Sequence, residues 1–424
     1  MVVKRMALKK LNILIIAHLD DFPTNERPVA GMFIKEFVDG ICDSCNYRVM
    51  LVGKVFLSIG FRTQLKQLLS LMEKLFKGTL FYKKNSGQNK CLNQGREFIL
   101  PVFYPIVRIL GRPVYFLSGL SLVLMAKRVL MKSGFKPDVI QTFKSFPSAY
   151  IGWKLRQKFH VPVINIEYQG PFSSYCSEPY CMERALAAIR NVDVTVHSRF
   201  QIGVIKKYGV SENKLRYWHF GVDTEQFVWD EKSHLKRKTE MEEKRFKLLV
   251  IGRVEEAKGL KYLIGALLAF VDKYPEICLS IVGPRGDCLD WVMMTIEQQG
   301  LEKNVECLGE VQHEELPGVI NSHDVIIVAS LFETFGLTIV EALSCGKPVV
   351  ATRCGGPEEI VDEDVGVLVP ARDSAALAKG IEYVIQNYQK YDPIKIRKYA
   401  VDNYDHRIML GKLFKLYDEF SLKG

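Results

Sequence analysis

This sequence of 424 residues has no apolar run long enough to cross a membrane. The longest apolar region, Val114–Ala126, is shorter than the ~20 residues that a spanning helix needs, so no transmembrane helix is expected. The sequence also lacks low-complexity segments and internal repeats. Its content of 48% hydrophobic and 25% charged residues is typical of a globular, soluble protein. At this length, two domains of roughly 200 residues each are expected.

Cysteine pairs with metal-ligand spacing are scarce. Of the ten cysteines, Cys42 and Cys45 form one C-x-x-C, and no second pair completes a zinc site. We therefore expect no bound metal and reduced thiols. Cys345 and Cys354 flank a predicted strand and are expected to be packing residues.

Acidic residues are scarce in one long segment. Residues 54–135 contain 14 Lys/Arg and two Asp/Glu, whereas the rest of the chain contains 44 and 46, so this segment accounts for the whole positive net charge. Between Phe61 and Phe76, apolar residues recur near a helical period with cations interleaved. Such a basic amphipathic helix suits an anionic membrane surface. The alternative is that the apolar stripe packs on the domain core. No nucleic-acid-binding motif accompanies the charge, so no nucleic-acid partner is expected.

The start of the chain has basic residues followed by a short apolar run, Leu11–Ala17. Asp20 and Asp21 come soon afterwards, without a small-residue cleavage site, so the run predicts a buried first strand rather than a signal peptide. We therefore expect a cytoplasmic protein, with peripheral docking at the inner face of the membrane through residues 54–135 as an open alternative.

Strands and helices alternate along both halves of the chain. In the first half, the pattern predicts strands at 12–17, 47–52, 139–141, 163–166 and 192–196, and helices at 32–42, 149–159 and 181–190. A second series of strands is predicted at 247–252, 278–283, 305–308, 325–329, 349–351 and 366–369. This alternation predicts α/β domains with doubly wound parallel sheets, whose ligands bind at the carboxyl ends of the strands.

The charge pattern suggests where the domains divide. We expect an N-terminal domain over residues 1–229, which contains the basic insert at about 54–135. A charged linker is expected at 230–246, followed by a C-terminal domain at 247–395. Residues 396–424 are predicted to form a helical segment that returns to the N-terminal domain.

The most informative segment holds two glutamates eight positions apart, Glu333 and Glu341. The pattern around them predicts a strand, a glycine loop, a helix and a second strand. Backbone N–H groups at Gly336, Leu337 and Thr338 would point out of the helix N-terminus, where a phosphate binds favourably. The neighbouring carboxylates can accept hydrogen bonds from hydroxyls. A ligand with both a diphosphate and many hydroxyls is a nucleotide sugar.

A series of motifs between Leu248 and Ile385 resembles the group-1, or family-four, retaining glycosyltransferases. The resemblance implies the GT-B fold, in which two doubly wound Rossmann-like domains face a central cleft. The motifs are Gly252-Arg253-Val254 with Lys258-Gly259, Ile281-Val282-Gly283, Leu308-Gly309-Glu310-Val311, the E-x7-E element, Gly346-Lys347-Pro348, and Gly355-Gly356-Pro357-Glu358-Glu359. In the first half, Val196-His197-Ser198 and Gly221-Val222-Asp223 with Phe227 resemble the stretch that precedes the family's hinge.

The resemblance implies roles for individual residues. Arg253 and Lys258 would hold the donor diphosphate and stabilise the charge of the leaving group. Glu333, the third expected catalytic residue, would contact hydroxyls of the donor sugar. Glu341 would accept hydrogen bonds from the ribose hydroxyls. The other donor-binding residues are expected to be Gly31, Val311, Gly336, Leu337 and Thr338.

Some residues depart from the family or have two interpretations. Glu167 matches a family glutamate and either orients a sugar hydroxyl or is structural. Tyr168 stands where many members have a donor-contacting histidine, and His219-Phe220 replaces the usual Pro-Asn. Asp362-Glu363-Asp364 has the form of a metal-binding D-x-D motif, but its position before Gly366 predicts a loop, and the resemblance implies no need for a metal.

We therefore expect a metal-independent, retaining glycosyltransferase that uses a UDP-, GDP- or ADP-sugar donor and no further cofactor. The expected acceptor is a glycan or a lipid-linked molecule, in the synthesis of surface polysaccharide or glycolipid. Two alternatives stay open. One is a non-catalytic, membrane-associated subunit of a polysaccharide-assembly complex, and the other is a phosphorylase or epimerase of the same fold.

Overall fold

The computed structural model describes residues 11–18, 46–57, 99–109, 112–114, 116–168, 170, 179–242, 246–269 and 271–421. The chain divides into two compact units, which comprise residues 1–196, 202–218 and 410–424, and residues 197–201 and 219–409. Gly31, the Cys42–Cys45 pair, the predicted helix at 32–42 and much of the basic segment 54–135 lie outside the described residues. The same is true of the predicted amphipathic helix between Phe61 and Phe76.

The first unit is built on a sheet of order β4-β3-β2-β1-β5-β6-β7-β8. All neighbouring strands are parallel except β3 and β4, which are antiparallel. The strands are β1 (Asn12–His18), β2 (Asn46–Leu57), β3 (Ile99–Ile109), β4 (Arg112–Val114), β5 (Val139–Phe143), β6 (Val163–Glu167), β7 (Asp193–Val196) and β8 (Leu215–Tyr217). Its helices are α3 (Phe116–Ser133), α4 (Tyr150–Phe159), α5 (Pro179–Ile189) and most of α6 (Arg199–Lys206).

The five strands predicted for this half are confirmed as β1, β2, β5, β6 and β7. Strands β3, β4 and β8 were not predicted. Pro101 and Pro105 lie within β3, and proline cannot donate to a strand ladder, so this segment lacks the signal of a regular strand. The described residues of β1 from Ile13 to Ala17 are fully buried, as expected of a first strand in the core.

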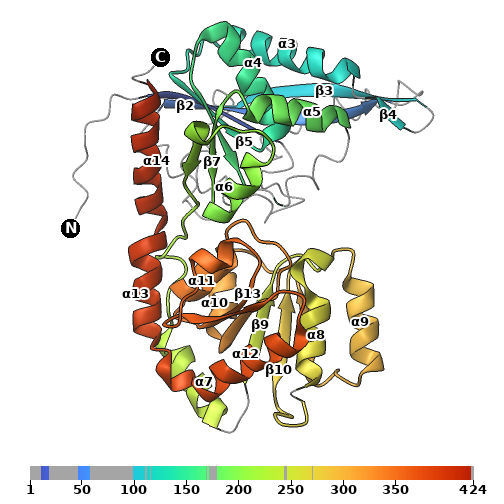
Figure 1. The fold of residues 1–424 in the computed structure, drawn as a ribbon, viewed down its shortest axis with the longest axis vertical. Helices are drawn as coiled ribbons and strands as arrows, with labels where there is room; N and C mark the ends of the chain where they lie inside the picture. The colour runs from blue at the N-terminus through green and yellow to red at the C-terminus, as the bar shows by residue number, and fades with distance from the viewer. Residues whose placement is uncertain are drawn as a thin grey trace. The chain divides into compact units, whose positions relative to one another are not determined.

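The second unit has a fully parallel sheet of order β11-β10-β9-β12-β13-β14. Its strands confirm the predicted series and are β9 (Lys247–Ile251), β10 (Cys278–Val282), β11 (Val305–Gly309), β12 (Val325–Val328), β13 (Val349–Arg353) and β14 (Gly366–Pro370). The helices are α7 (Glu231–Glu242), α8 (Leu260–Leu268), α9 (Leu289–Gln298), α10 (Leu316–Asn321), α11 (Leu337–Ser344), α12 (Ser374–Gln386) and α13 (Pro393–Tyr404). Figure 1 shows these helices around the strands.

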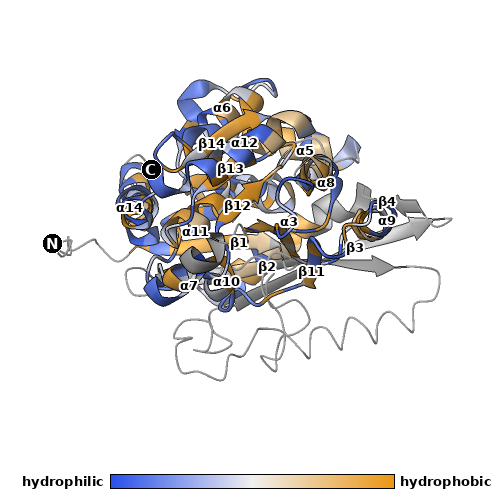
Figure 2. Ribbon diagram, turned by 90° about the horizontal axis from the view of Figure 1, so that it is seen from below, coloured by the Kyte–Doolittle hydropathy of each residue, from blue (hydrophilic) through white to orange (hydrophobic). Residues whose placement is uncertain are grey.

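Buried aliphatic side chains hold the second sheet between its helices. All four residues of β12 are buried, and this strand has the hydrophobic colour in Figure 2. A strand covered on both faces is expected to be apolar throughout, as the sequence Val-Ile-Ile-Val is. Strands β9 and β12 are neighbours in the sheet, and the chain continues from them in opposite directions, toward β10 and toward β13. Their carboxyl ends therefore form a switch point, which is where ligands bind in such sheets.

The observed domain boundary differs from the expected one. The second unit begins at His219 rather than near residue 230. The expected linker at 230–246 contains helix α7 instead, and Arg237 of this helix forms an ion pair with Asp324 in which both side chains are buried. The high charge of this segment suggested an exposed linker, but one of its cations has a specific partner in the domain core.

The end of the chain contributes to both units. Helix α14 (His406–Ser421) begins in the second unit, and residues from Leu410 onward belong to the first. In the first unit, the Tyr417 hydroxyl donates a 2.9 Å hydrogen bond to Oε1 of Gln141 on β5, and both side chains are fully buried. The segment expected to return to the N-terminal domain therefore has its last turns in that unit.

Candidate functional site

Glycines join the ends of three adjacent strands in the second unit. The Gly252 N–H donates to the Val282 carbonyl, and the Gly283 N–H donates to the Gly309 carbonyl, both at 2.8 Å. A Cβ atom on Gly283 would lie 2.0 Å from the Gly252 oxygen, so the two turns approach more closely than any side chain allows. The backbone after β9 is thereby fixed where Arg253 leaves the sheet.

Lys258 lies in the short turn that leads from β9 into α8. Its Nζ is 3.2 Å from Oε1 and 3.5 Å from Oε2 of Glu333, in the loop after β12. Glu333 raises the pKa of the Lys258 ammonium by its negative charge, although burial opposes this shift. The next residue, Gly259, has φ +65°, and a Cβ there would lie 2.0 Å from the Ala329 oxygen. This close approach brings the two strand ends together.

Arg253 is the more exposed of the two predicted cations. Its side chain is 57% exposed, and its nearest described carboxylate is Glu255, with Nε 3.8 Å from Oε2. Such an exposed pair is weak, so the guanidinium can exchange this contact for an anionic ligand at little cost. Arg253 and Lys258 both leave the carboxyl end of β9, as the motif predicted.

The loop between β12 and α11 supplies a helix N-terminus. Gly336 precedes α11 with φ +109°, and no described side chain forms a cap hydrogen bond there. The N–H groups of the first helical turn have no partner within a helix, so those at Leu337 and Thr338 suit an anion. Phe335 is buried against His219, whose ring stacks on it at 4.6 Å and 17°. The histidine that departs from the family's Pro-Asn thus supports this loop.

The backbone of Glu333 is held on both sides. Its N–H donates to the Cys354 carbonyl at 3.1 Å, and its own carbonyl accepts from the Gly356 N–H at 2.8 Å. Glu358 and Glu359, which follow Gly356 in the sequence, contact other segments of the unit. Glu359 Oε1 accepts from the Arg199 and Phe200 N–H groups at the start of α6, and Glu358 forms an exposed pair with Arg353 at 3.8 Å.

Glu341 lies on α11, five residues after Gly336, and its side chain is 7% exposed. His313 Nε2 lies 3.4 Å from Glu341 Oε1, and the Gln226 amide contacts the same histidine. Neither Gln226 nor His313 was singled out from the sequence. Val311 is half-buried and packs against the core, so its side chain serves the fold. The predicted cations, glutamates and glycine loop therefore come together in one unit, while Val311 contributes packing.

Glu167 and Tyr168 are the residues of the first unit that the sequence singled out near the donor and that the structure describes. Glu167 is fully buried, and its Oε2 accepts hydrogen bonds from the Ser145 N–H at 3.0 Å and from the Ser145 hydroxyl. These contacts favour the structural alternative for Glu167. The Tyr168 ring lies 5.5 Å from Lys144 Nζ. Gly31, the remaining predicted donor-binding residue, lies outside the described residues.

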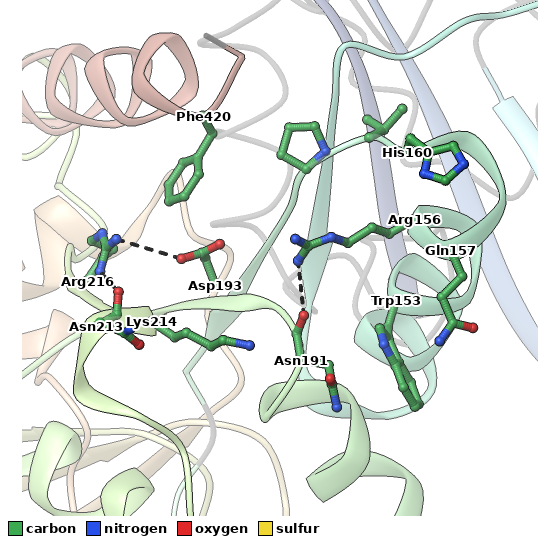
Figure 3. A pocket seen from close by; sticks show the side chains of 12 residues that line it. Trp153, Arg156, Gln157, His160, Asn191, Asp193, Asn213, Lys214, Arg216 and Phe420 are labelled. Atoms are coloured by element: carbon green, nitrogen blue, oxygen red, sulfur yellow. Dashed lines mark hydrogen bonds and ion pairs between the residues drawn. The ribbon is translucent and has the colours of Figure 1, made fainter. Parts of the chain in front are cut away.

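A cavity of about 740 Å³ opens in the first unit, at the amino ends of β6 to β8 (Figure 3). Three cations line it, but each contacts backbone carbonyls. Arg156 donates to the Asn191 carbonyl at 3.0 Å, Lys214 donates to the Arg190 carbonyl at 2.8 Å, and Arg216 donates to its own turn. The first two carbonyls follow the last turn of α5, so these cations stabilise a helix C-terminus. The cavity lies at the edge opposite to the one where such sheets bind ligands.

The sequence also led to expectations about metal binding, cysteine thiols and membrane-spanning helices. In the described part of the chain, no cluster of three or more His, Cys, Asp or Glu residues could hold a metal ion. Asp362 accepts a hydrogen bond from the Asp364 N–H within a turn, so the D-x-D sequence forms the expected loop. Cys345 and Cys354 are buried free thiols, as expected of packing residues, and burial raises the pKa of Cys345 to about 12. None of the described helices combines the length and apolar character needed to cross a bilayer.

The chain is similar in sequence to known glycosyltransferases. Residues 231–401 match the family model of the glycosyl transferases group 1. An uncharacterised glycosyltransferase of Methanocaldococcus jannaschii is 28% identical over 50% of this chain and 59% of its own length, so less than two thirds of that relative is covered. The D-inositol 3-phosphate glycosyltransferase of Corynebacterium jeikeium is 27% identical over 65% of this chain and 71% of its own.

The similarity to solved structures covers both units. The crystal structure of HepE from Anabaena in complex with UDP-glucose has a TM-score of 0.69 and 19% identity to this chain, and covers 96% of this chain and 100% of its own. At this identity the likeness establishes the fold, which is the predicted pair of Rossmann-like domains. Residues 231–401 thus match the group-1 glycosyl transferases, and the chain has the GT-B fold of two Rossmann-like domains.

Proposed function

We propose that this protein transfers a sugar from a nucleotide-sugar donor to a glycan or lipid-linked acceptor, with retention of the anomeric configuration. The observation that carries the proposal is the Lys258–Glu333 pair beside the uncapped start of α11. A cation and a helix N-terminus suit a diphosphate, and a neighbouring carboxylate suits sugar hydroxyls. The UDP-glucose complex of HepE supports a donor of this class.

In the proposed reaction, the bond between the anomeric carbon and the diphosphate oxygen breaks, and a bond forms between that carbon and an acceptor hydroxyl oxygen. The hydroxyl proton passes to the departing diphosphate on the same face of the sugar, which accounts for retention. Lys258, Arg253 and the N–H groups of Leu337 and Thr338 stabilise the negative charge that grows on the leaving group. These groups need no metal ion to assist them.

Two carboxylates divide the recognition of the donor. Glu333 is held by its backbone and faces Lys258, so a hydroxyl of the transferred sugar can donate to it next to the diphosphate. Glu341 is buried farther along α11, where the ribose hydroxyls are proposed to donate to it. The bound nucleotide would then run along the helix from its N-terminus, with the diphosphate at Gly336–Thr338.

The class of acceptor is proposed from the charge of the first unit. The basic segment at 54–135 would dock on an anionic membrane surface and give access to lipid-linked acceptors. A role in surface polysaccharide or glycolipid synthesis, at the inner face of the membrane, follows from that proposal. The apolar stripe packing on the domain core remains the alternative use of the same segment.

The proposal is tested by thermal unfolding of the protein with a panel of UDP-, GDP- and ADP-sugars. A donor at one hundred times its Kd should stabilise the protein by about 2.7 kcal/mol. Arg253→Ala and Lys258→Ala should abolish this stabilisation. Lys273→Ala, which removes an exposed surface pair with Glu382, is the matched control and should retain it.

The outcome also separates the alternatives. A donor-specific shift that requires Arg253 supports the transferase and directs the search to acceptors. If no donor stabilises the wild-type protein, with or without anionic vesicles, the non-catalytic subunit becomes the better explanation. Cleavage of a glycan that depends on inorganic phosphate would instead indicate a phosphorylase.

A further inference from the structure

We infer that Gln226 and His313 are positioning residues that fix Glu341 against the donor ribose, and thereby make the site select ribonucleoside over 2′-deoxyribonucleoside diphosphates. The inference rests on the proposed function, because it takes Glu341 as the carboxylate that binds the ribose. Sequence patterns assigned no role to either positioning residue.

His313 and Glu341 are in contact, and both side chains are largely buried. The carboxylate is 7% exposed and the imidazole 15%, and His313 Nε2 lies 3.4 Å from Glu341 Oε1. An ionised carboxylate can only accept hydrogen bonds, so Nε2 must carry the proton in this contact. Because the histidine uses Oε1, the second oxygen of Glu341 is left for a ligand hydroxyl.

Gln226 contacts the imidazole and the backbone of His313. The Gln226 amide nitrogen lies 3.1 Å from the His313 carbonyl oxygen and 3.4 Å from His313 Nδ1. The amide therefore donates to both, and Nδ1 is the acceptor. Rotation of the amide by half a turn would place its oxygen against the carbonyl oxygen. Gln226 thus favours the neutral tautomer with its proton on Nε2, which is the tautomer that donates to Glu341.

Gln226 lies in a turn that Asp223 stabilises. Asp223 Oδ1 accepts from the Glu225 N–H at 2.9 Å and from the Gln226 N–H at 3.2 Å, and the Asp223 carbonyl accepts from the Phe227 N–H at 2.8 Å. The buried Phe227 ring then packs edge-on against His313, with ring centres 5.2 Å apart. One turn therefore presents both the amide and the ring that hold the imidazole.

This turn is hydrogen-bonded to α11, the helix that carries Glu341. The Phe227 carbonyl accepts a 2.6 Å hydrogen bond from the Ser344 hydroxyl, three residues after Glu341 on α11. Arg397 donates to the same carbonyl at 2.8 Å. The turn, the imidazole and the carboxylate thus form a closed frame, in which Glu341 has one preferred orientation.

This frame has a consequence for ligand choice. A ribose 2′-hydroxyl that donates to a fixed, buried carboxylate forms a charge-assisted hydrogen bond. A 2′-deoxyribose leaves that carboxylate desolvated and short of one donor, which is penalised strongly. A carboxylate that could turn toward water would avoid the penalty. Selectivity therefore depends on the residues that hold Glu341 as well as on Glu341 itself.

The test compares the Kd of UDP, GDP and ADP with that of each 2′-deoxy counterpart by calorimetry. For the nucleotide that binds, the wild-type protein should prefer the ribose form by about tenfold or more. His313→Phe keeps an aromatic ring but cannot donate, and should reduce the preference to roughly threefold or less. His313→Gln can donate from nearly the position of Nε2 and should restore it. Gln226→Leu should give an intermediate preference.

Lys303→Ala, at an exposed residue just before β11, is the control and should keep the wild-type preference. Thermal unfolding of each variant shows whether it folds. If the wild-type protein binds no nucleoside diphosphate, the proposed function fails and this inference fails with it. If the wild type binds without a ribose preference, or His313→Phe keeps the full preference, this inference alone is overturned and the proposed donor site stands.

Discussion

Lys258 Nζ lies 3.2 Å from Glu333 Oε1, although the two residues are 75 positions apart in the chain. The contact joins the turn after β9 to the loop after β12, and these two strands are neighbours in the sheet. Their side chains are 24% and 19% exposed, so the pair is partly shielded from water. The ammonium and the carboxylate both lie at a strand switch point. A ligand with an anionic diphosphate and a sugar hydroxyl can engage both, because the diphosphate suits the ammonium and the hydroxyl can donate to the carboxylate.

The first prediction concerns this pair. Lys258→Met should lower kcat/KM for the proposed sugar transfer by about 10² to 10³, because the cation proposed to stabilise the leaving diphosphate is lost. Glu333→Gln should also lower it. Since the residues are in contact, the double variant should lose less than the product of the two single effects. Steady-state kinetics of the four proteins measure this coupling. Fully multiplicative effects would show that the residues act independently.

The second prediction concerns the glycine before α11. Gly336 has φ +109°, and a Cβ there would lie 2.9 Å from Ile339 Cδ1, so Gly336→Ala should destabilise the protein by about 1–3 kcal/mol. It should also weaken donor binding. Gly318→Ala is the matched control, because this helical glycine has no atom within 4 Å of the added Cβ. The control should be neutral or stabilising by about 0.5–1 kcal/mol. Urea unfolding that ranks the variants in the reverse order would contradict the prediction.

The third prediction separates two adjacent glutamates. Glu359 accepts hydrogen bonds from two N–H groups at the start of α6, so Glu359→Ala should cost about 1 kcal/mol of unfolding free energy. Glu358 forms an exposed pair with Arg353 at 3.8 Å, and Glu358→Ala should change the stability by less than about 0.5 kcal/mol. Equal effects in chemical denaturation would remove the assigned capping role.

The fourth prediction concerns pH. Burial alone would raise the pKa of Asp405, but hydrogen bonds from Arg407 and Thr224 outweigh it and lower the pKa to about 2. A carboxyl group with a lowered pKa stabilises the fold above its ordinary value of 3.8, and this contribution is lost as the pH falls through 2. Asp405→Asn should therefore cost roughly 2 kcal/mol at pH 7 and about half as much at pH 3.

Denaturation at the two pH values measures this difference. Asp402→Asn is the control, because Asp402 is an exposed partner of Lys398 on the surface of α13 and its removal should have little effect at either pH. A difference between wild type and Asp405→Asn that stays constant from pH 7 to pH 3 would show that the charge of Asp405 is not what stabilises the fold.

Much of the second unit could be predicted from the sequence. Most of its strands are short apolar runs, and helices α8 and α11 begin at glycine turns, so hydrophobic periodicity located every strand of the second sheet. The same regularity located Arg253, Lys258 and the glutamates at strand ends and helix starts. Parallel strands bring their carboxyl ends to one edge of the sheet. The position of each residue relative to a predicted strand was therefore enough to expect these residues close together in space.

Contacts that depend on tertiary packing could not be predicted in this way. Gln226 lies 87 residues from His313, and no periodic pattern links them. His219 stacks on Phe335 although it replaces a different family residue. Helix α7 has high charge and little apolar surface, which indicated a linker, and its buried Arg237 pairs with Asp324 of the domain core. In each case a pair of distant side chains determines the structure, and only the folded chain brings the pair together.

The buried pair of Arg237 and Asp324 has a practical consequence for expressing the second unit on its own. Arg237 donates to Asp324 from Nε at 3.0 Å and from Nη2 at 2.6 Å, and the Lys247 N–H donates to the same carboxylate at 2.7 Å. A fragment cut at the start of β9 would leave this carboxylate without its guanidinium. Breaking one side of a buried pair typically costs about 3–5 kcal/mol, a large part of the stability of an ordinary domain. A fragment that begins at His219 retains the helix and its arginine, and is the better choice for expression.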